Sequence, residues 1–429
     1  MVVAIIVSMV AFLDSNIANL ALPATARDLG GGLPLQQWVV DGYLLALAAM
    51  ILPGGSISDL FGRVPVMRFG LAAFGTGSML AATAAFPAML ITGRVIQGLG
   101  GAFLVPGSLA LINSAFDRAD RPAAIGSWTA WTSAALALGP VLGGLTVDVL
   151  SWRWIYILLA IPVVIGFALT FWLHPMPGRA ERTRVDAAGA ALSAAGLGAT
   201  AYALIESQQH GWTSPLVATS SGVGVVALLA FVAWERRAPN PMVPLQLFAM
   251  PNFAAANLAT AFIYGGLTLG SIATVLYLQE VADYPAIVAG LIALPNPIVT
   301  FLFARRVGNA AARIGSWVFL VGGPVLAAGM ALTITPLSSV ILMSVEPAHC
   351  GIAAAFQNAV GRTSALTAVA CVGLVAAGPL NDAGFARLLE VSAALYFLGA
   401  VVSGVAIVHP AAGDGAAKTP APREAVRAV

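Results

Sequence analysis

Ionisable side chains interrupt three of the apolar segments of this sequence. Asp14, Asp41 and Arg94 each lie inside such a segment, and Gln97 follows Arg94 by one helical turn. A charged group in an apolar segment is costly, and its presence points to proton transfer or ligand binding. A carboxyl group that exchanges a proton, opposed by a guanidinium that favours its ionised form, can couple proton movement to another event.

Asp14 is the first candidate for this proton chemistry. Thirteen residues precede it, which is about 20 Å at helical rise and places the carboxyl deep in the apolar layer. The alternative is a residue that snorkels to water or caps a helix locally. We predict that Asp14 is the main proton-linked acid of the N-terminal half.

Arg94 and Asp41 are predicted to have different roles, Arg94 in proton coupling and Asp41 in substrate binding. A guanidinium in lipid must pair with a carboxylate, a carbonyl group or water, so Arg94 is predicted to modulate an acid, against the alternative of a structural ion pair. Asp41 is a candidate for the substrate site, and the alternative of a hydrated carboxylate without a role stays open. Gln97 and Trp131 complete the predicted substrate site, although membrane aromatics more often serve packing.

The composition indicates the elements that must position these residues. Of 429 residues, 59% are hydrophobic and 9% are charged, whereas a soluble domain carries about 25% charged residues. In lipid only helices and closed barrels satisfy their backbone hydrogen bonds. We therefore predict an all-α integral membrane protein with about thirteen membrane-spanning helices. The predicted spans cover 2–22, 36–55, 65–84, 87–112, 123–147, 152–173, 186–206, 214–234, 252–279, 285–304, 316–345, 361–378 and 386–408.

The same composition argues against several classes of function. The two cysteines, Cys350 and Cys371, lack metal-site spacing, the four histidines are scattered, and the net charge is +2. No nucleophile or phosphate-binding motif is present. We predict no enzymatic activity, no metal, no cofactor and no nucleic-acid partner, and we expect a monomer.

Basic residues are unevenly distributed among the predicted loops. The loops after the second, fourth, sixth, eighth and tenth spans hold two or more arginines each, whereas the loops between them hold only Arg27 and Arg153. Cytoplasmic loops are enriched in Lys and Arg. We predict a plasma-membrane protein with its N-terminus in the cytoplasm, and the membrane side on which the first span ends is called the predicted outer end.

Weak internal repeats suggest two related halves. Gly55–Gly62 recurs as Gly308–Gly315, and the segment after Val105 recurs after Thr335. The interval Gly62–Pro106 is 44 residues and Gly315–Pro336 is 21, a deficit of about one membrane span. We predict an N-terminal six-helix bundle (1–173), a linker with a two-helix insert (174–240), an incomplete C-terminal bundle (241–408) and a disordered tail of cytoplasmic type (409–429).

A polar block, GGSISDLFGRVPVMR at 54–68, separates the second and third spans. We predict a short loop in which Gly55 and Gly62 let two helix ends approach, while Asp59 and Arg63 contact helix termini and gate the cytoplasmic side. The alternative is a solvated loop whose charges only set the topology. In the fifth span, Gly139, Pro140, Gly143 and Gly144 are spaced for close helix packing and a bend.

These residues also carry a family resemblance. The run Leu13-Asp-Ser-Asn-Ile-Ala-Asn-Leu-Ala-Leu-Pro23, the block Gly55–Arg63, Arg94-Val-Ile-Gln-Gly98 and Leu138-Gly-Pro-Val-Leu-Gly-Gly144 resemble motifs of the major facilitator superfamily. Within it they are similar to the fourteen-helix drug:proton antiporter branch, so the chain looks like a branch member that lacks about one helix.

The resemblance implies a multidrug efflux transporter. It implies a two-bundle fold with a central two-helix insert, and secondary active, proton-coupled export of hydrophobic or cationic small molecules across the lipid bilayer. The resemblance also implies that Asp41 acts on cationic substrates. Two alternatives remain: a proton-coupled transporter of one specific metabolite, and an inactive truncated transporter. A metabolite site would place more ionisable or amide groups within the spans than this sequence contains.

Overall fold

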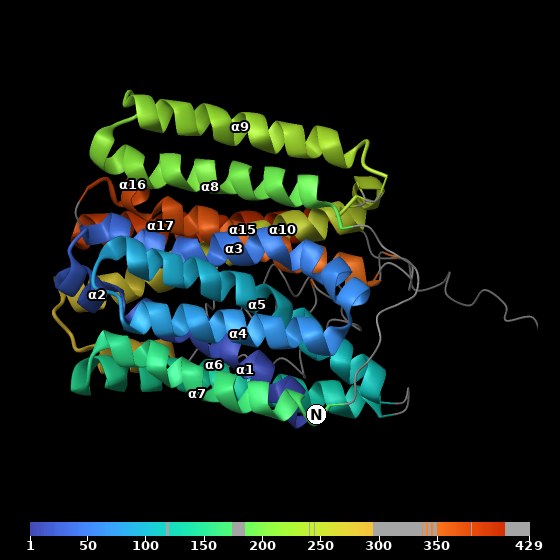
Figure 1. Ribbon diagram of the computed structural model, residues 1–429. Coiled ribbons are helices and arrows are strands. Elements are labelled where there is room, and N and C mark those ends of the chain that lie inside the picture. Colours follow the sequence, from blue (N-terminus) through green and yellow to red (C-terminus); the bar gives the residue numbers. More distant parts are fainter. Residues whose placement is uncertain are drawn as a thin grey trace, which may run out of the picture.

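A computed structural model describes residues 1–116, 120–173, 185–239, 241–243, 245–294, 337, 340–341, 345, 350–378 and 380–407. Every regular element in this part of the chain is a helix, as Figure 1 shows. Eight of the described helices are long and apolar enough to cross a membrane. The predicted class, an all-α integral membrane protein, is confirmed.

The first bundle consists of long helices that run side by side (Figure 1). They are α1 (Val2–Leu20), α3 (Gly32–Phe61), α4 (Arg63–Ala82), α5 (Pro87–Ala115), α6 (Arg121–Val149) and α7 (Trp152–Thr170), with the short α2 (Leu22–Leu29) after α1. α5 lies against both α3 and α4, α1 against α6, and α4 against α7. A Cβ on Gly100 of α5 would lie 2.5 Å from the Gly70 carbonyl oxygen of α4, so this close approach requires glycine.

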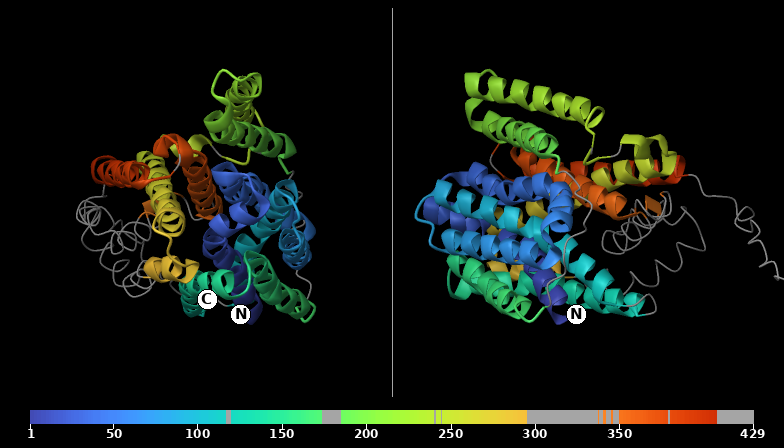
Figure 2. Two further views of the ribbon diagram at one scale, coloured as in Figure 1. Left: turned by 90° about the vertical axis from the view of Figure 1, so that its left-hand side faces the viewer. Right: turned by 45° about the vertical axis from the view of Figure 1, so that its right-hand side comes forward.

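The C-terminal elements pack around α10. They are η1 (Leu245–Ala249), α10 (Pro251–Leu276), the π-turn η2 (Tyr277–Val281), α11 (Ala286–Ala293), α15 (Cys350–Ala370), α16 (Val372–Ala376) and α17 (Asp382–Ala406). α10 packs against α15 and α17, while α15 contacts α3 and α11 contacts α6 of the first bundle. Figure 2 shows both contacts between the halves nearly end on.

A helical hairpin lies beside the two bundles. It is made of α8 (Ala187–His210) and α9 (Pro215–Glu235). α8 packs against α9, α3, α15 and α16, and α9 is outermost in Figures 1 and 2. Leu216, Val226 and Leu229 of α9 are at least 65% exposed, which suits contact with lipid. The predicted domain boundaries at 173 and 240 stay predictions.

The polar block at 54–68 is not the loop that the sequence suggested. α3 continues through Pro53 to Phe61, and α4 begins at Arg63, so only Gly62 separates the helices. Ser, Ile, Asp, Leu and Phe are all tolerated in a helix interior, and the chain turns only where Gly62 adopts φ 87°, a conformation that favours glycine. The prediction that Asp59 and Arg63 are loop residues is therefore wrong: they belong to the last turn of α3 and the start of α4.

The C-terminal half departs from the predicted spans at one further point. α15 begins at Cys350, eleven residues before the predicted start at 361, because the alanines at 353–355 favour helix over the predicted loop. The predicted helix over 316–345 lies outside the described residues except for four isolated positions. The prediction of about thirteen spans, the missing helix and the tail at 409–429 stay predictions.

Candidate functional site

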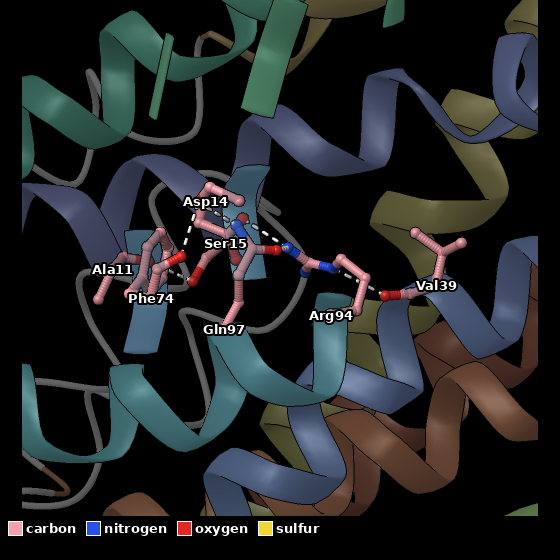
Figure 3. Close-up of polar contacts among 8 residues, drawn as sticks. Ala11, Asp14, Ser15, Val39, Phe74, Arg94 and Gln97 are labelled. Atoms are coloured by element: carbon pink, nitrogen blue, oxygen red, sulfur yellow. Dashed lines mark hydrogen bonds and ion pairs between the residues drawn. The ribbon is translucent and has the colours of Figure 1, made fainter. Parts of the chain in front are cut away.

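The centre of the candidate site is an ion pair buried inside the first bundle. Arg94 Nη1 of α5 donates to Asp14 Oδ1 of α1 at 2.6 Å, and the two side chains are 2% and 0% exposed. Figure 3 shows the guanidinium pointing from its helix toward the carboxylate. The structure thus brings together the two residues that were predicted to handle the proton.

The remaining hydrogen bonds of Arg94 fix its orientation. Nε donates to the Val39 carbonyl oxygen of α3 at 2.9 Å, and Nη1 donates to Gln97 Oε1 at 2.9 Å. Its guanidinium also lies over the Tyr43 ring, 4.5 Å from the centroid. A guanidinium with several donors directed at fixed acceptors is rigid, as a charge held in low dielectric must be.

A fourth helix joins the network through Gln97. Gln97 Nε2 donates to Ser78 Oγ of α4 at 2.8 Å, and Ser78 Oγ donates to the Phe74 carbonyl oxygen at 2.9 Å. Because Gln97 follows Arg94 by three residues, both side chains lie on one face of α5. The network, shown in Figure 3, therefore connects α1, α3, α4 and α5.

One oxygen of the central carboxylate remains open. Asp14 Oδ2 is buried and has no hydrogen-bond partner in the described part of the chain. A carboxylate with one oxygen held by an arginine and one oxygen unpartnered can accept a proton without first losing a hydrogen bond. Such a proton would remove the charge that holds Arg94.

Asp41 lies apart from this network, on a face of α3 directed toward the C-terminal half. Its side chain is 0% exposed, and neither carboxylate oxygen has a hydrogen-bond partner among the described residues. The carboxylate is within electrostatic range of the Cys371 thiol, next to α16. This burial differs from the hydrated vestibule of the alternative reading, and an unpaired buried carboxyl is a candidate for a proton or a cation.

Trp131 is not placed with the other predicted site residues. It is 57% exposed, and among the described residues no hydrogen bond or ring contact joins it to Asp14, Arg94 or Gln97. Sequence reasoning missed Tyr43 and Ser78, which complete the network. Tyr43 is one helical turn from Val39, the acceptor for Arg94, and this spacing was the available signal.

The small residues of α6 face two neighbours, α1 of the same bundle and α11 of the C-terminal half. Gly139 and Gly143 face α1, whereas a Cβ on Gly144 would lie 2.5 Å from Ile287 Cα of α11. From the other side, a Cβ on Gly290 of α11 would lie 2.2 Å from the Pro140 carbonyl oxygen. Small residues let the backbones approach closely, so these two helices pack through their glycines.

Polar contacts join the same halves at the predicted outer end. Gln37 Nε2 of α3 donates to the carbonyl oxygens of Val369 and Ala370 of α15, at 2.8 and 3.1 Å. Asp148 of α6 accepts from the backbone N–H groups of Ala286 and Ile287, at 3.0 and 2.8 Å. The halves are therefore closed against each other at this end.

The residues of the polar block at 54–68 form the end of α3, the turn at Gly62 and the start of α4. Gly55 has open space around it, and Gly62 provides the turn between α3 and α4. Arg63 is the first residue of α4. The predicted gating role of Gly55, Asp59, Gly62 and Arg63 stays a prediction.

Comparisons with known proteins agree on one family. The sequence profile described as Major Facilitator Superfamily matches residues 4–377. The chain is 34% identical over 387 residues to multidrug resistance protein Stp of Mycobacterium tuberculosis (strain CDC 1551 / Oshkosh), covering 82% of this chain and 71% of that protein. It is 32% identical over 419 residues to the methylenomycin A resistance protein of Bacillus subtilis (strain 168), covering 89% and 88%.

Solved structures resemble this fold at much lower sequence identity. A crystal structure of the peptide transporter POT in complex with sulfate matches with a TM-score of 0.65 at 15% identity, covering 94% of this chain and 93% of that chain. At this identity the likeness concerns the fold alone.

Proposed function

Because this chain belongs to the Major Facilitator Superfamily, we propose that it is a secondary active exporter that exchanges protons for hydrophobic or cationic small molecules. Its relatives are named for multidrug and antibiotic resistance, and efflux transport is the function they support. The buried Asp14–Arg94 pair with its open carboxylate oxygen is the observation that carries the proton coupling.

The proposed coupling step is a change of partner by Arg94. When a proton binds Asp14 Oδ2, the carboxyl becomes neutral and its attraction for the guanidinium falls. Arg94 keeps Val39 and Gln97 as acceptors. Its guanidinium therefore stays hydrogen-bonded while α1 is released from α5. A local change of this kind can bias a two-state equilibrium between bundles.

The driving force in this proposal is the proton gradient alone, without a cofactor. The protein acts as a monomer in the plasma membrane with its N-terminus in the cytoplasm. Asp41, which is buried and has no hydrogen-bond partner among the described residues, attracts cationic substrates at the contact between the halves. This part of the proposal rests on charge and burial.

Proteoliposomes with the purified full-length chain test the function directly. An imposed pH gradient should drive ethidium across the membrane, and a protonophore should abolish the movement. Asp41→Asn should reduce ethidium transport, because the amide removes the attraction for the cation and leaves the side-chain volume unchanged. Wild-type protein that moves no probe under any gradient would contradict the proposal and favour the inactive, truncated alternative.

A further inference from the structure

Arg362 of α15 is a second cation at membrane depth, contributed by the C-terminal half. It follows Cys350, the first residue of α15, by 12 residues and precedes Ala370, the last, by 8. At about 1.5 Å per residue, these intervals are about 18 Å and about 12 Å. The guanidinium therefore starts from the middle of the helix, far from both ends.

The helical repeat shows which side of α15 carries Arg362. Val369, whose carbonyl oxygen accepts from Gln37 of α3, follows Arg362 by seven residues, or about two turns, and lies on the same face. On α3, Tyr43 follows Gln37 by six residues, a rise of about 9 Å. On α15, the seven residues from Arg362 to Val369 give a rise of about 10 Å. Arg362 and Tyr43 are thus at the same level on facing helices.

The electrostatics agree with this placement. The Arg362 guanidinium lies within electrostatic range of the hydroxyl groups of Tyr43 on α3 and of Tyr264 on α10. Tyr264 is held beside α15, since a Cβ on Gly361 would lie 3.2 Å from its ring. Arg362 therefore lies near enough to both tyrosine hydroxyl groups to act on them electrostatically, and one of these residues, Tyr43, stacks on Arg94.

Within the described part of the chain, Arg362 differs from Arg94 in having no hydrogen-bond acceptor. Arg94 has an ion pair and hydrogen bonds to Val39 and Gln97, whereas no ion pair or hydrogen bond joins Arg362 to any described residue. Its side chain is also only partly buried. A guanidinium at membrane depth without a partner is costly unless a ligand or water supplies the acceptor.

From this position we propose that Arg362 binds the anionic group of a transported molecule. The guanidinium presents parallel N–H donors that fit a carboxylate, and Tyr43 and Tyr264 offer aromatic surface to the apolar part. The inference rests on the proposed export function and extends its substrates to aromatic or aliphatic organic acids. Asp41 and Arg362 then serve cations and anions, respectively, on opposite sides of the contact between the halves.

Equilibrium binding to the purified full-length chain tests this role without requiring transport. The probes are tritiated 2-naphthoate and tritiated 2-naphthylmethylammonium, which share a ring system and differ in charge. Arg362→Gln should weaken naphthoate binding about tenfold or more, because a charge-assisted pair is lost. Arg362→Lys should weaken naphthoate binding less, because lysine retains the positive charge but lacks the parallel N–H donors of the guanidinium. Binding of the ammonium probe should not weaken in either variant.

The matched control is Arg387→Gln, which removes one positive charge from α17, where Arg387 donates to the Ala376 carbonyl oxygen. It should leave naphthoate binding unchanged. Equal loss of both probes in Arg362→Gln, or unchanged naphthoate binding, would overturn the proposal. If Arg362→Gln does not fold, the wild type decides: naphthoate should protect Arg362 from phenylglyoxal, and undiminished labelling would overturn the proposal.

The two proposals fail in different ways. Naphthoate binding that depends on Arg362, in a protein that moves no probe in proteoliposomes, contradicts export and supports the anion site. Proton-driven ethidium export with naphthoate binding that ignores Arg362 supports export and contradicts the anion site.

Discussion

Two aspartate–arginine pairs in this molecule have the same bond length and opposite surroundings. Asp14–Arg94 and Asp28–Arg153 are both joined at 2.6 Å. The first pair is 0% and 2% exposed, whereas in the second pair Arg153 is 35% exposed and Asp28 is 45% exposed. The geometry of an ion pair therefore says little about its energy, and burial determines what happens when one partner is removed.

The exposed pair has the features of a structural contact. Asp28 Oδ2 also accepts from Trp152 Nε1 at 3.1 Å, and Arg153 Nη2 donates to the Ala84 carbonyl oxygen at 2.9 Å. These bonds fasten the short helix α2 and the turn after α4 to the start of α7 at the predicted outer end. Water can replace each of them, and the pair holds no open, buried oxygen.

The largest expected effect comes from removing the buried acid. Asp14→Ala leaves Arg94 charged, buried and without its ion-pair partner, and it should cost about 3–5 kcal/mol of unfolding free energy. Asp28→Ala at the exposed pair should cost about 1 kcal/mol or less. Chemical denaturation of both variants in the same detergent measures the difference, and equal losses would break the comparison.

A smaller effect is expected where α6 and α11 meet. Gly290→Val places a Cβ against the Pro140 carbonyl oxygen, 2.2 Å away, and overpacking of this kind costs about 1–3 kcal/mol. Because the strain exists only when the halves are closed at the predicted outer end, the variant should shift the protein toward the open state. Spin-label distances between α6 and α11 should lengthen.

The control for this variant is Gly222→Val on α9, where an added Cβ would meet no described atom within 4 Å apart from its chain neighbours and its own helix backbone. Its spin-label distances should match those of the wild type. Unchanged distances in Gly290→Val would show that this glycine contact does not contribute to closure.

The smallest effect is the pH dependence of the exposed pair. The Arg153 guanidinium and the Trp152 indole, through their hydrogen bonds, lower the pKa of Asp28 from its usual 3.8. A lowered folded-state pKa gives stability that is present above 3.8 and lost as the pH falls through the folded value. Asp28→Asn should therefore be less stable than the wild type at neutral pH, by about 1 kcal/mol or less, and equally stable in strong acid. Thermal unfolding at several pH values would show a constant difference if this reasoning is wrong.

The sequence predicted the helices of the first bundle well because each is a long apolar run bounded by polar or glycine residues. It failed at 54–68, where polar composition suggested a loop although no residue between Gly55 and Phe61 breaks a helix. It failed again at Cys350, because an alanine-rich helix start resembles a linker when it is read by hydropathy. Composition indicates whether a segment lies in polar or apolar surroundings, and the backbone can remain helical in both.

The candidate site was predictable in part. Asp14 and Arg94 were recognised separately, because a single charge in an apolar run is visible in the sequence. Their pairing, the partners of Gln97 and the exposure of Trp131 depend on how α1, α3, α4 and α5 are rotated against one another. Arg362 was missed because its helix was predicted to begin at 361, which placed it at a helix end where an arginine is ordinary.

The proton-coupling role of Asp14 is tested most directly by pH-driven ethidium export in everted vesicles that contain Asp14→Asn. The amide retains the side-chain volume and a hydrogen bond to Arg94 but cannot cycle a proton. Asp28→Asn, the same chemical change at the exposed pair, is the matched control. At equal membrane abundance, Asp14→Asn should lose export driven by the pH gradient while Asp28→Asn retains it. Export by Asp14→Asn at the wild-type rate would contradict the assignment of the proton to this carboxyl.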